Sequence, residues 1–161
     1  MPTSTYTPLA TVTLGGSDSS ITFSSIPATY RDLIMVINGS TTANADFGLR
    51  FNGDSGANYS FVYIGGAGST SVSGASASET QVVLDAYFWR SSERGLVVAQ
   101  IMDYSATDKH KTVLSRNNVG NAGVDAFANR WANTAAINSI LLFTGQAFAT
   151  GTTISLYGVI A

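Results

Sequence analysis

The chain has 161 residues, no cysteine and a formal net charge of −2, and 45% of its residues are hydrophobic while only 11% are charged. The lack of cysteine excludes disulfides and cysteine-based zinc sites, and the near-zero net charge argues against a nucleic-acid-binding surface. Soluble domains typically contain about 25% charged residues. A surface this poor in charge is suited to packing against other protein surfaces, because little charge has to be desolvated.

Apolar residues alternate with polar ones at a period of two along most of the chain, which predicts β-strands. In chain order we expect strands over residues 9–14, 21–23, 32–38, 47–51, 59–63, 81–89, 95–103, 110–116, 124–131, 137–143 and 152–160. The run at 32–38 is almost continuously apolar, as in a central strand covered on both faces. Residues 65–78 are rich in Gly, Ser and Ala and are predicted to form a long exposed loop.

Long helices are not predicted, since no window carries an apolar stripe of period 3.6, and residues 132–139 offer one helical turn at most. Strands without helices between them predict an all-β fold, a single-domain antiparallel β-sandwich of the jelly-roll type with roughly ten strands. We place this domain at residues 9–161, with its first and last strands close together. Residues 1–8 are predicted to be an N-terminal arm that reaches a neighbouring subunit.

Membrane insertion and secretion signals are not expected from the sequence. The longest apolar runs are too short to cross a bilayer, and residues 1–10 lack the basic and apolar regions of a signal peptide. We therefore expect neither a membrane nor a nucleic acid among the partners.

The sequence contains little that resembles a known arrangement of catalytic residues. His110, the only histidine, lies in a polar loop, and no Gly-x-Ser-x-Gly motif accompanies it as a hydrolase triad would require. Glu79 and Glu93 are the only glutamates, and nothing in the pattern brings them to the two sides of one glycosidic bond. We predict no enzymatic activity and no catalytic residue.

A metal or cofactor site is likewise not predicted. Asn52, Asp54 and Asn58 offer oxygen ligands at alternate positions, loosely like a calcium loop, but the bidentate Glu that ends such a loop is missing. Turn formation accounts for this segment, since Asn, Gly and Asp favour tight turns.

The consecutive aromatic residues Tyr87, Phe88 and Trp89 point to a surface for binding. A strand sends successive side chains to opposite faces, so at least one of the three points away from its own core. That arrangement fits either a subunit interface or a sugar-stacking platform, and the low charge favours the interface. The predicted interface residues are Tyr87, Phe88 and Trp89, together with Met1, Pro2, Tyr6 and Pro8 of the arm.

Short turn and strand motifs spread over nearly the whole chain are YTPLATVTL at 6–14, ITFSSIP at 21–27, YRDL at 30–33, LRFNGD at 49–54, NYS at 58–60, AAINSI at 135–140 and ATGTTISLYG at 149–158. In these motifs the chain resembles small jelly-roll virion proteins of tailed phages and marine phages, including capsid cement or decoration proteins and proteins described as structural or tail-fibre proteins. The motifs are structural and not catalytic, so they specify the fold better than the role.

The resemblance implies a structural virion protein on the outer capsid surface, binding between neighbouring copies of the major capsid protein and assembling with itself, most simply as a trimer. Two alternatives remain open. One is a trimeric tail-fibre or receptor-binding head that contacts host glycans. The other is a carbohydrate-binding module outside any virion.

Overall fold

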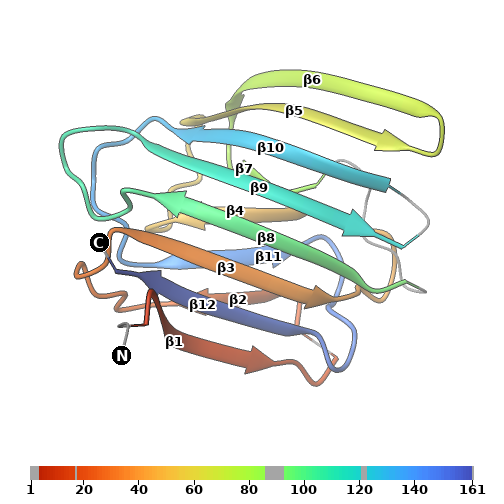
Figure 1. Ribbon diagram of the computed structural model, residues 1–161, viewed down its shortest axis with the longest axis horizontal. Coiled ribbons are helices and arrows are strands. Elements are labelled where there is room, and N and C mark those ends of the chain that lie inside the picture. The colour runs from red at the N-terminus through yellow and green to blue at the C-terminus, as the bar shows by residue number, and fades with distance from the viewer. Residues whose placement is uncertain (1–3, 17, 86–92, 121–122, 161) are drawn as a thin grey trace.

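The computed structural model describes residues 4–16, 18–85, 93–120 and 123–160. Over these residues the chain forms twelve strands and no helix, arranged as an eight-stranded and a four-stranded antiparallel sheet that lie one behind the other (Figure 1). The predicted all-β, single-domain antiparallel sandwich is confirmed. None of the described segments is a helix that could span a membrane.

The larger sheet has the strand order β1-β12-β3-β8-β9-β10-β5-β6. Its strands are β1 (Tyr6–Thr13), β12 (Thr153–Val159), β3 (Asp32–Gly39), β8 (Gly95–Met102), β9 (Lys111–Val119), β10 (Gly123–Trp131), β5 (Tyr59–Ala67) and β6 (Thr70–Glu79). The smaller sheet has the order β2-β11-β4-β7 and is made of β2 (Ser20–Phe23), β11 (Ile140–Thr144), β4 (Phe47–Phe51) and β7 (Val82–Val83).

The first and last strands lie side by side, as the sequence predicted. β1 pairs with β12, with Tyr6 opposite Val159 and Pro8 opposite Tyr157. β1 therefore begins within the predicted arm, and residues 6–8 belong to the sheet. Their strand has a bulge between Pro8 and Ala10. Proline and a bulge both discourage further pairing at a sheet edge, and β1 is such an edge.

The prediction of a long exposed loop at residues 65–78 is wrong. This segment is the end of β5 and nearly all of β6, joined by a tight turn with Gly68 at a φ of +59°. β6 is stabilised by contacts with larger side chains on the neighbouring strand β5, which cannot be inferred from the small residues of β6 itself. Gly74 pairs with Tyr63, and a Cβ atom on Gly74 would lie 2.6 Å from Cε1 of that ring. An aromatic ring that covers a cross-strand glycine supplies the packing that glycine lacks.

Two other expected segments also differ from the structure. The strand expected at 81–89 is reduced to β7, Val82–Val83, within the described residues, and residues 86–89 lie outside them. The single helical turn considered at 132–139 is not helical. The remaining strands lie within a few residues of their predicted positions.

The core fills the space between the two sheets, and its largest fully buried side chains include Trp131, Tyr59 and Phe51. Alternation places Leu33, Met35 and Ile37 of β3 in this core. On the opposite side of the same strand, Ile34 and Val36 remain only partly buried. The prediction that this strand is covered on both faces therefore holds for one face only, because no second layer of this chain packs on the other within the described residues.

Candidate interaction surface

The side chains of the eight-stranded sheet that point away from the core form one continuous surface, here termed the outer face. Strand register arranges them in rows, because residues paired across antiparallel strands share a face. One row is Tyr157, Ile34, Gln100, Leu114, Ala128 and Val62. The next is Ser155, Val36, Val98, Arg116, Ala126 and Ile64.

The outer face carries large apolar side chains that the chain itself leaves in solvent. Ile64 is 68% exposed, Val124 59% and Val62 57%, and Leu114 and Leu96 are also exposed. Water contact is unfavourable for such groups by roughly 25 cal/mol per Å² of apolar area. Apolar residues gathered on one face, in contrast to single scattered ones, mark a site for protein interaction or ligand binding.

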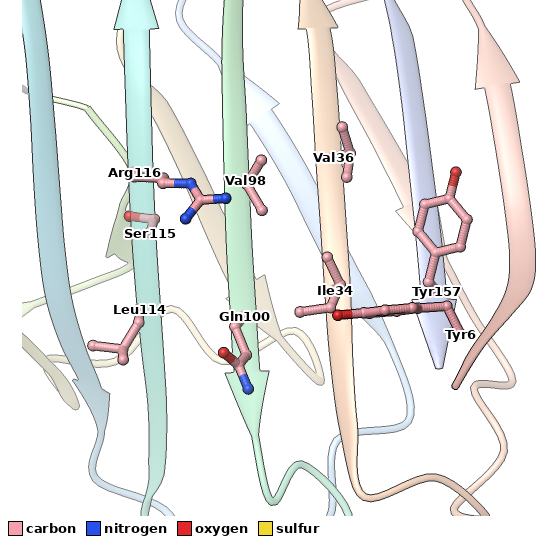
Figure 2. Close-up of a pocket in the computed structure, with 9 residues that line it drawn as sticks. All are labelled: Tyr6, Ile34, Val36, Val98, Gln100, Leu114, Ser115, Arg116 and Tyr157. Atoms are coloured by element: carbon pink, nitrogen blue, oxygen red, sulfur yellow. The ribbon is translucent and has the colours of Figure 1, made fainter. Parts of the chain in front are cut away.

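A hollow of about 640 Å³ opens on the outer face over β1, β12, β3, β8 and β9. In Figure 2 its lining side chains stand on neighbouring strands, with Tyr6 and Tyr157 at one side and Leu114 and Arg116 at the other. Ile34, Val36 and Val98 form its floor between them, and Gln100 lines it as well. The hollow therefore combines two aromatic rings, an aliphatic floor and a few polar groups.

Charge is scarce on this surface. At the outer-face positions of the described strands, the ionisable groups that carry charge at neutral pH are Arg116, Arg130 and Asp32. Asp32 is itself buried, at one end of β3. Its carboxylate accepts hydrogen bonds from the Gln100 side chain at 2.9 Å and from the Arg31 guanidinium at 3.0 Å. A partner that covers the outer face would therefore have few charges to desolvate.

Inside the sandwich, asparagines of the larger sheet hold the short strand β7. The Asn129 side chain accepts from the Val83 N–H at 3.0 Å and donates to the Val83 carbonyl at 2.9 Å, as a paired strand residue would. Asn117 donates from Nδ2 to the Leu84 carbonyl at 3.1 Å. These bonds satisfy backbone groups at the edge of the smaller sheet, where β7 is the last strand.

The next residue, Asp85, is buried to 3% exposure, and neither oxygen of its carboxyl group has a hydrogen-bond partner among the residues that the structure describes. Burial raises the pKa of Asp85 to about 8, and the nearby carboxyls of Asp46 and Asp125 add to the effect. Buried polar groups are almost always partnered, so this one requires an explanation.

The predicted interface residues are only partly within the described residues. Tyr6 and Pro8 are exposed on β1, and Tyr6 lines the hollow. Met1, Pro2, Tyr87, Phe88 and Trp89 lie outside the described residues. The outer face itself was not anticipated, although apolar runs such as residues 62–64, which are apolar on both strand faces, carried the signal.

The residues weighed for catalysis or metal binding have structural surroundings. His110 is exposed just before β9, and Glu79 at the end of β6 accepts a hydrogen bond from Ser76. The carboxylate of Asp54 accepts from Trp131 Nε1 at 2.7 Å, from the Gly56 N–H at 2.8 Å and from Asn58 at 3.0 Å.

The side chain of Asn52 is likewise engaged within the fold. Its oxygen accepts from the N–H groups of Asn138 and Ser139, and its amide donates to the Ala136 carbonyl. The turn at 52–58 thus uses its oxygens to hold the fold together. In the described part of the chain, no three His, Cys, Asp or Glu side chains gather closely enough to hold a metal ion.

Comparison of the sequence with models of known protein families gives no match, and comparison with curated proteins gives none.

Proposed function

We propose that this chain is a structural virion protein that decorates a phage capsid, binding between neighbouring capsid subunits and stabilising the shell, with the outer face as its main packing surface. The observation that carries the proposal is the apolar, charge-poor outer face with Val62, Ile64 and Leu114 in solvent. The sequence resemblance to small virion proteins supports the phage setting.

The architecture suits a mechanical role. The outer face lies on eight paired strands, so its side chains are held by a backbone that is hydrogen-bonded on both sides of every interior strand. A rigid, preformed surface loses little conformational entropy on binding. Such a surface can resist separation of two subunits without any chemical step, and each added contact raises the force needed to pull them apart.

Copy number in purified particles tests this proposal. Quantitative mass spectrometry would count the chain against the major capsid protein of the same particles. We expect about one copy per capsid subunit or one per three-fold position, and particles stripped of the chain by mild treatment should break at lower temperature. A handful of copies per particle would contradict capsid decoration and point to the tail.

A second candidate is the recognition of host glycans by a tail-fibre head or a free carbohydrate-binding module. The observation that favours it is the hollow, whose lining combines the rings of Tyr6 and Tyr157 with the polar side chains of Gln100 and Arg116. Aromatic faces with adjacent hydrogen-bonding groups are suited to sugar rings. Titration of the protein with a panel of oligosaccharides distinguishes the two, because decoration predicts no saturable binding, whereas glycan recognition predicts binding that Tyr157→Ala abolishes.

A further inference from the structure

Buried oxygen atoms without partners gather where β7 ends against β9 and β10. Within the described part of the chain, both carboxyl oxygens of Asp85 are without a hydrogen-bond partner, and so is Oδ1 of Asn117, a residue that is 5% exposed. The Asn117 amide is fixed by its hydrogen bond to the Leu84 carbonyl, the residue next to Asp85. That bond uses the nitrogen end of the amide and leaves its oxygen without a donor.

A second acid lies next to this asparagine. Asp125 on β10 is paired directly opposite Asn117 on β9, so their side chains share the inner face of the larger sheet. Asp125 is also buried, at 5% exposure. Among the described residues, the charged groups that act on Asp85 are the carboxyls of Asp46 and Asp125. The cluster is therefore acidic, buried and rich in oxygen.

We propose that Asp85, Asn117 and Asp125 form a binding site for a hard divalent cation, with Ca²⁺ as the ion that fits best. Carboxylate and amide oxygens are the ligands that Ca²⁺ prefers, and it tolerates irregular geometry better than Mg²⁺ does. The set contains neither the thiolate nor the imidazole ligands that most zinc sites use. Two carboxylates and one amide oxygen are a partial shell, since Ca²⁺ takes roughly six to eight oxygen ligands, and further oxygen ligands would have to complete it.

Cation binding would link the two sheets. Asp85 follows β7 at the edge of the smaller sheet, while Asn117 and Asp125 belong to the larger one. An ion held by all three would join the sheets where β7 contributes only two paired residues. This inference does not depend on the proposed virion role, because it concerns the interior and not the outer face.

Calcium titration of the intact chain is the decisive experiment. Protein freed of metal with a chelator is titrated with CaCl₂ in a calorimeter, and its melting temperature is followed with CaCl₂, with MgCl₂ and with NaCl at equal ionic strength. We expect saturable binding of one Ca²⁺ per chain and a rise of several degrees in melting temperature, because a ligand that binds only the folded state stabilises it. MgCl₂ should act much more weakly.

Two variants locate the site. Asp85→Asn and Asn117→Ala should remove the calcium-induced rise in melting temperature, while Asp108→Asn, at an exposed loop carboxylate, should keep it in full. Circular dichroism confirms that each variant is folded before titration. If the unaltered chain shows no saturable calcium binding, or if CaCl₂ raises the melting temperature no more than NaCl does, the proposal is overturned and Asp85 is a protonated carboxyl in the core. Calcium binding that persists in both folded variants would equally rule out this site.

Discussion

Trp131 donates its indole N–H to the carboxylate of Asp54 at 2.7 Å, which ties a surface turn to the centre of the core. The indole is 1% exposed and lies 5.5 Å from the Phe51 ring and 6.3 Å from the Tyr59 ring, measured between centroids. The Tyr59 hydroxyl in turn donates to the backbone carbonyl of Asp54. One aspartate therefore fixes the position of two core aromatic residues.

Replacing Asp54 should destabilise the fold. Asp54→Ala leaves the buried Trp131 N–H without an acceptor, and an unsatisfied buried donor costs about 1–3 kcal/mol. Asp54→Asn keeps an acceptor oxygen and should lose less. Urea denaturation followed by tryptophan fluorescence gives the free energy of unfolding. Asp108→Ala, at an exposed loop position, is the matched control, and an equal loss in both alanine variants would argue against the role assigned to Asp54.

Stability should also fall in acid because of Asp54 and Asp32. Burial on its own would raise the pKa of Asp32, but hydrogen bonds from the Asp103 N–H, Gln100 and Arg31 outweigh it and lower that pKa. The pKa of Asp54 is lowered in the same way by its donors, against the effect of burial. A carboxyl whose folded-state pKa is depressed stabilises the protein above its unfolded pKa and loses that contribution as pH falls through the folded value.

The measurement is melting temperature against pH, with attention to the range below about pH 4, where aspartates of the unfolded chain take up protons. The unaltered chain should lose stability steeply there, and the double variant Asp32→Asn/Asp54→Asn should lose less over the same interval. Parallel curves for the two proteins would show that these carboxyls do not govern acid unfolding.

Sequence reasoning predicted the fold class because the period-two alternation reflects a physical constraint, namely that one face of each strand must be buried. It failed at residues 65–78, since Gly, Ser and Ala have low intrinsic strand preference. The partner that makes them a strand, the ring of Tyr63, lies across the sheet on β5. The predicted first strand was also too short, because Pro8 was interpreted as lying outside it. At a sheet edge, however, proline is tolerated within a strand.

The candidate surface was harder to predict than the fold. Low charge indicated packing against another protein, and that signal came from composition alone. Which residues form the surface depends on strand order, since β8, β9 and β10 bring Leu114 beside Gln100 and Ala128 only through long-range pairing. Alternation shows that Val62 and Ile64 share a face, but not that this face lies opposite the smaller sheet. The cluster around Asp85 joins the end of β7 to the β9–β10 hairpin and has no local sequence pattern.

A substitution at Gly74 tests the packing of the hairpin formed by β5 and β6, which the sequence analysis did not predict. A Cβ there would lie 2.6 Å from the Tyr63 ring, which stacks on Phe127 at 5.0 Å between centroids. Gly74→Ala should displace the ring and cost about 1–3 kcal/mol, as overpacking does. Gly145→Ala is the control, because a Cβ at Gly145 meets no atom within 4 Å. Urea denaturation gives the free energy of unfolding of both variants. A Gly74 variant as stable as the control would show that the ring does not constrain this position.

Charged substitutions on the outer face should separate assembly from folding. Val62 and Leu114 both pair with Ala128 and lie in one row of exposed side chains. The double variant Val62→Lys/Leu114→Lys places two like charges on that row and removes apolar area from the packing surface. Exposed positions tolerate such changes within about 0.5 kcal/mol, so the melting temperature of the isolated chain should hardly change. Association should weaken strongly, because a partner would then have to desolvate both ammonium groups.

Light scattering coupled to size-exclusion chromatography measures that association, and the trimer that the sequence resemblance implies is the expected state of the unaltered chain. The control is Ala43→Lys, which adds a charge at an exposed position between β3 and β4. A trimer that persists in the double variant would mean that self-assembly uses another surface. The outer face would then be free for the capsid, and the same variant should fail to bind particles that the control still decorates. If the variant both assembles and decorates normally, the outer face is not the packing surface, because two buried lysines at its centre are incompatible with a closely packed apolar interface.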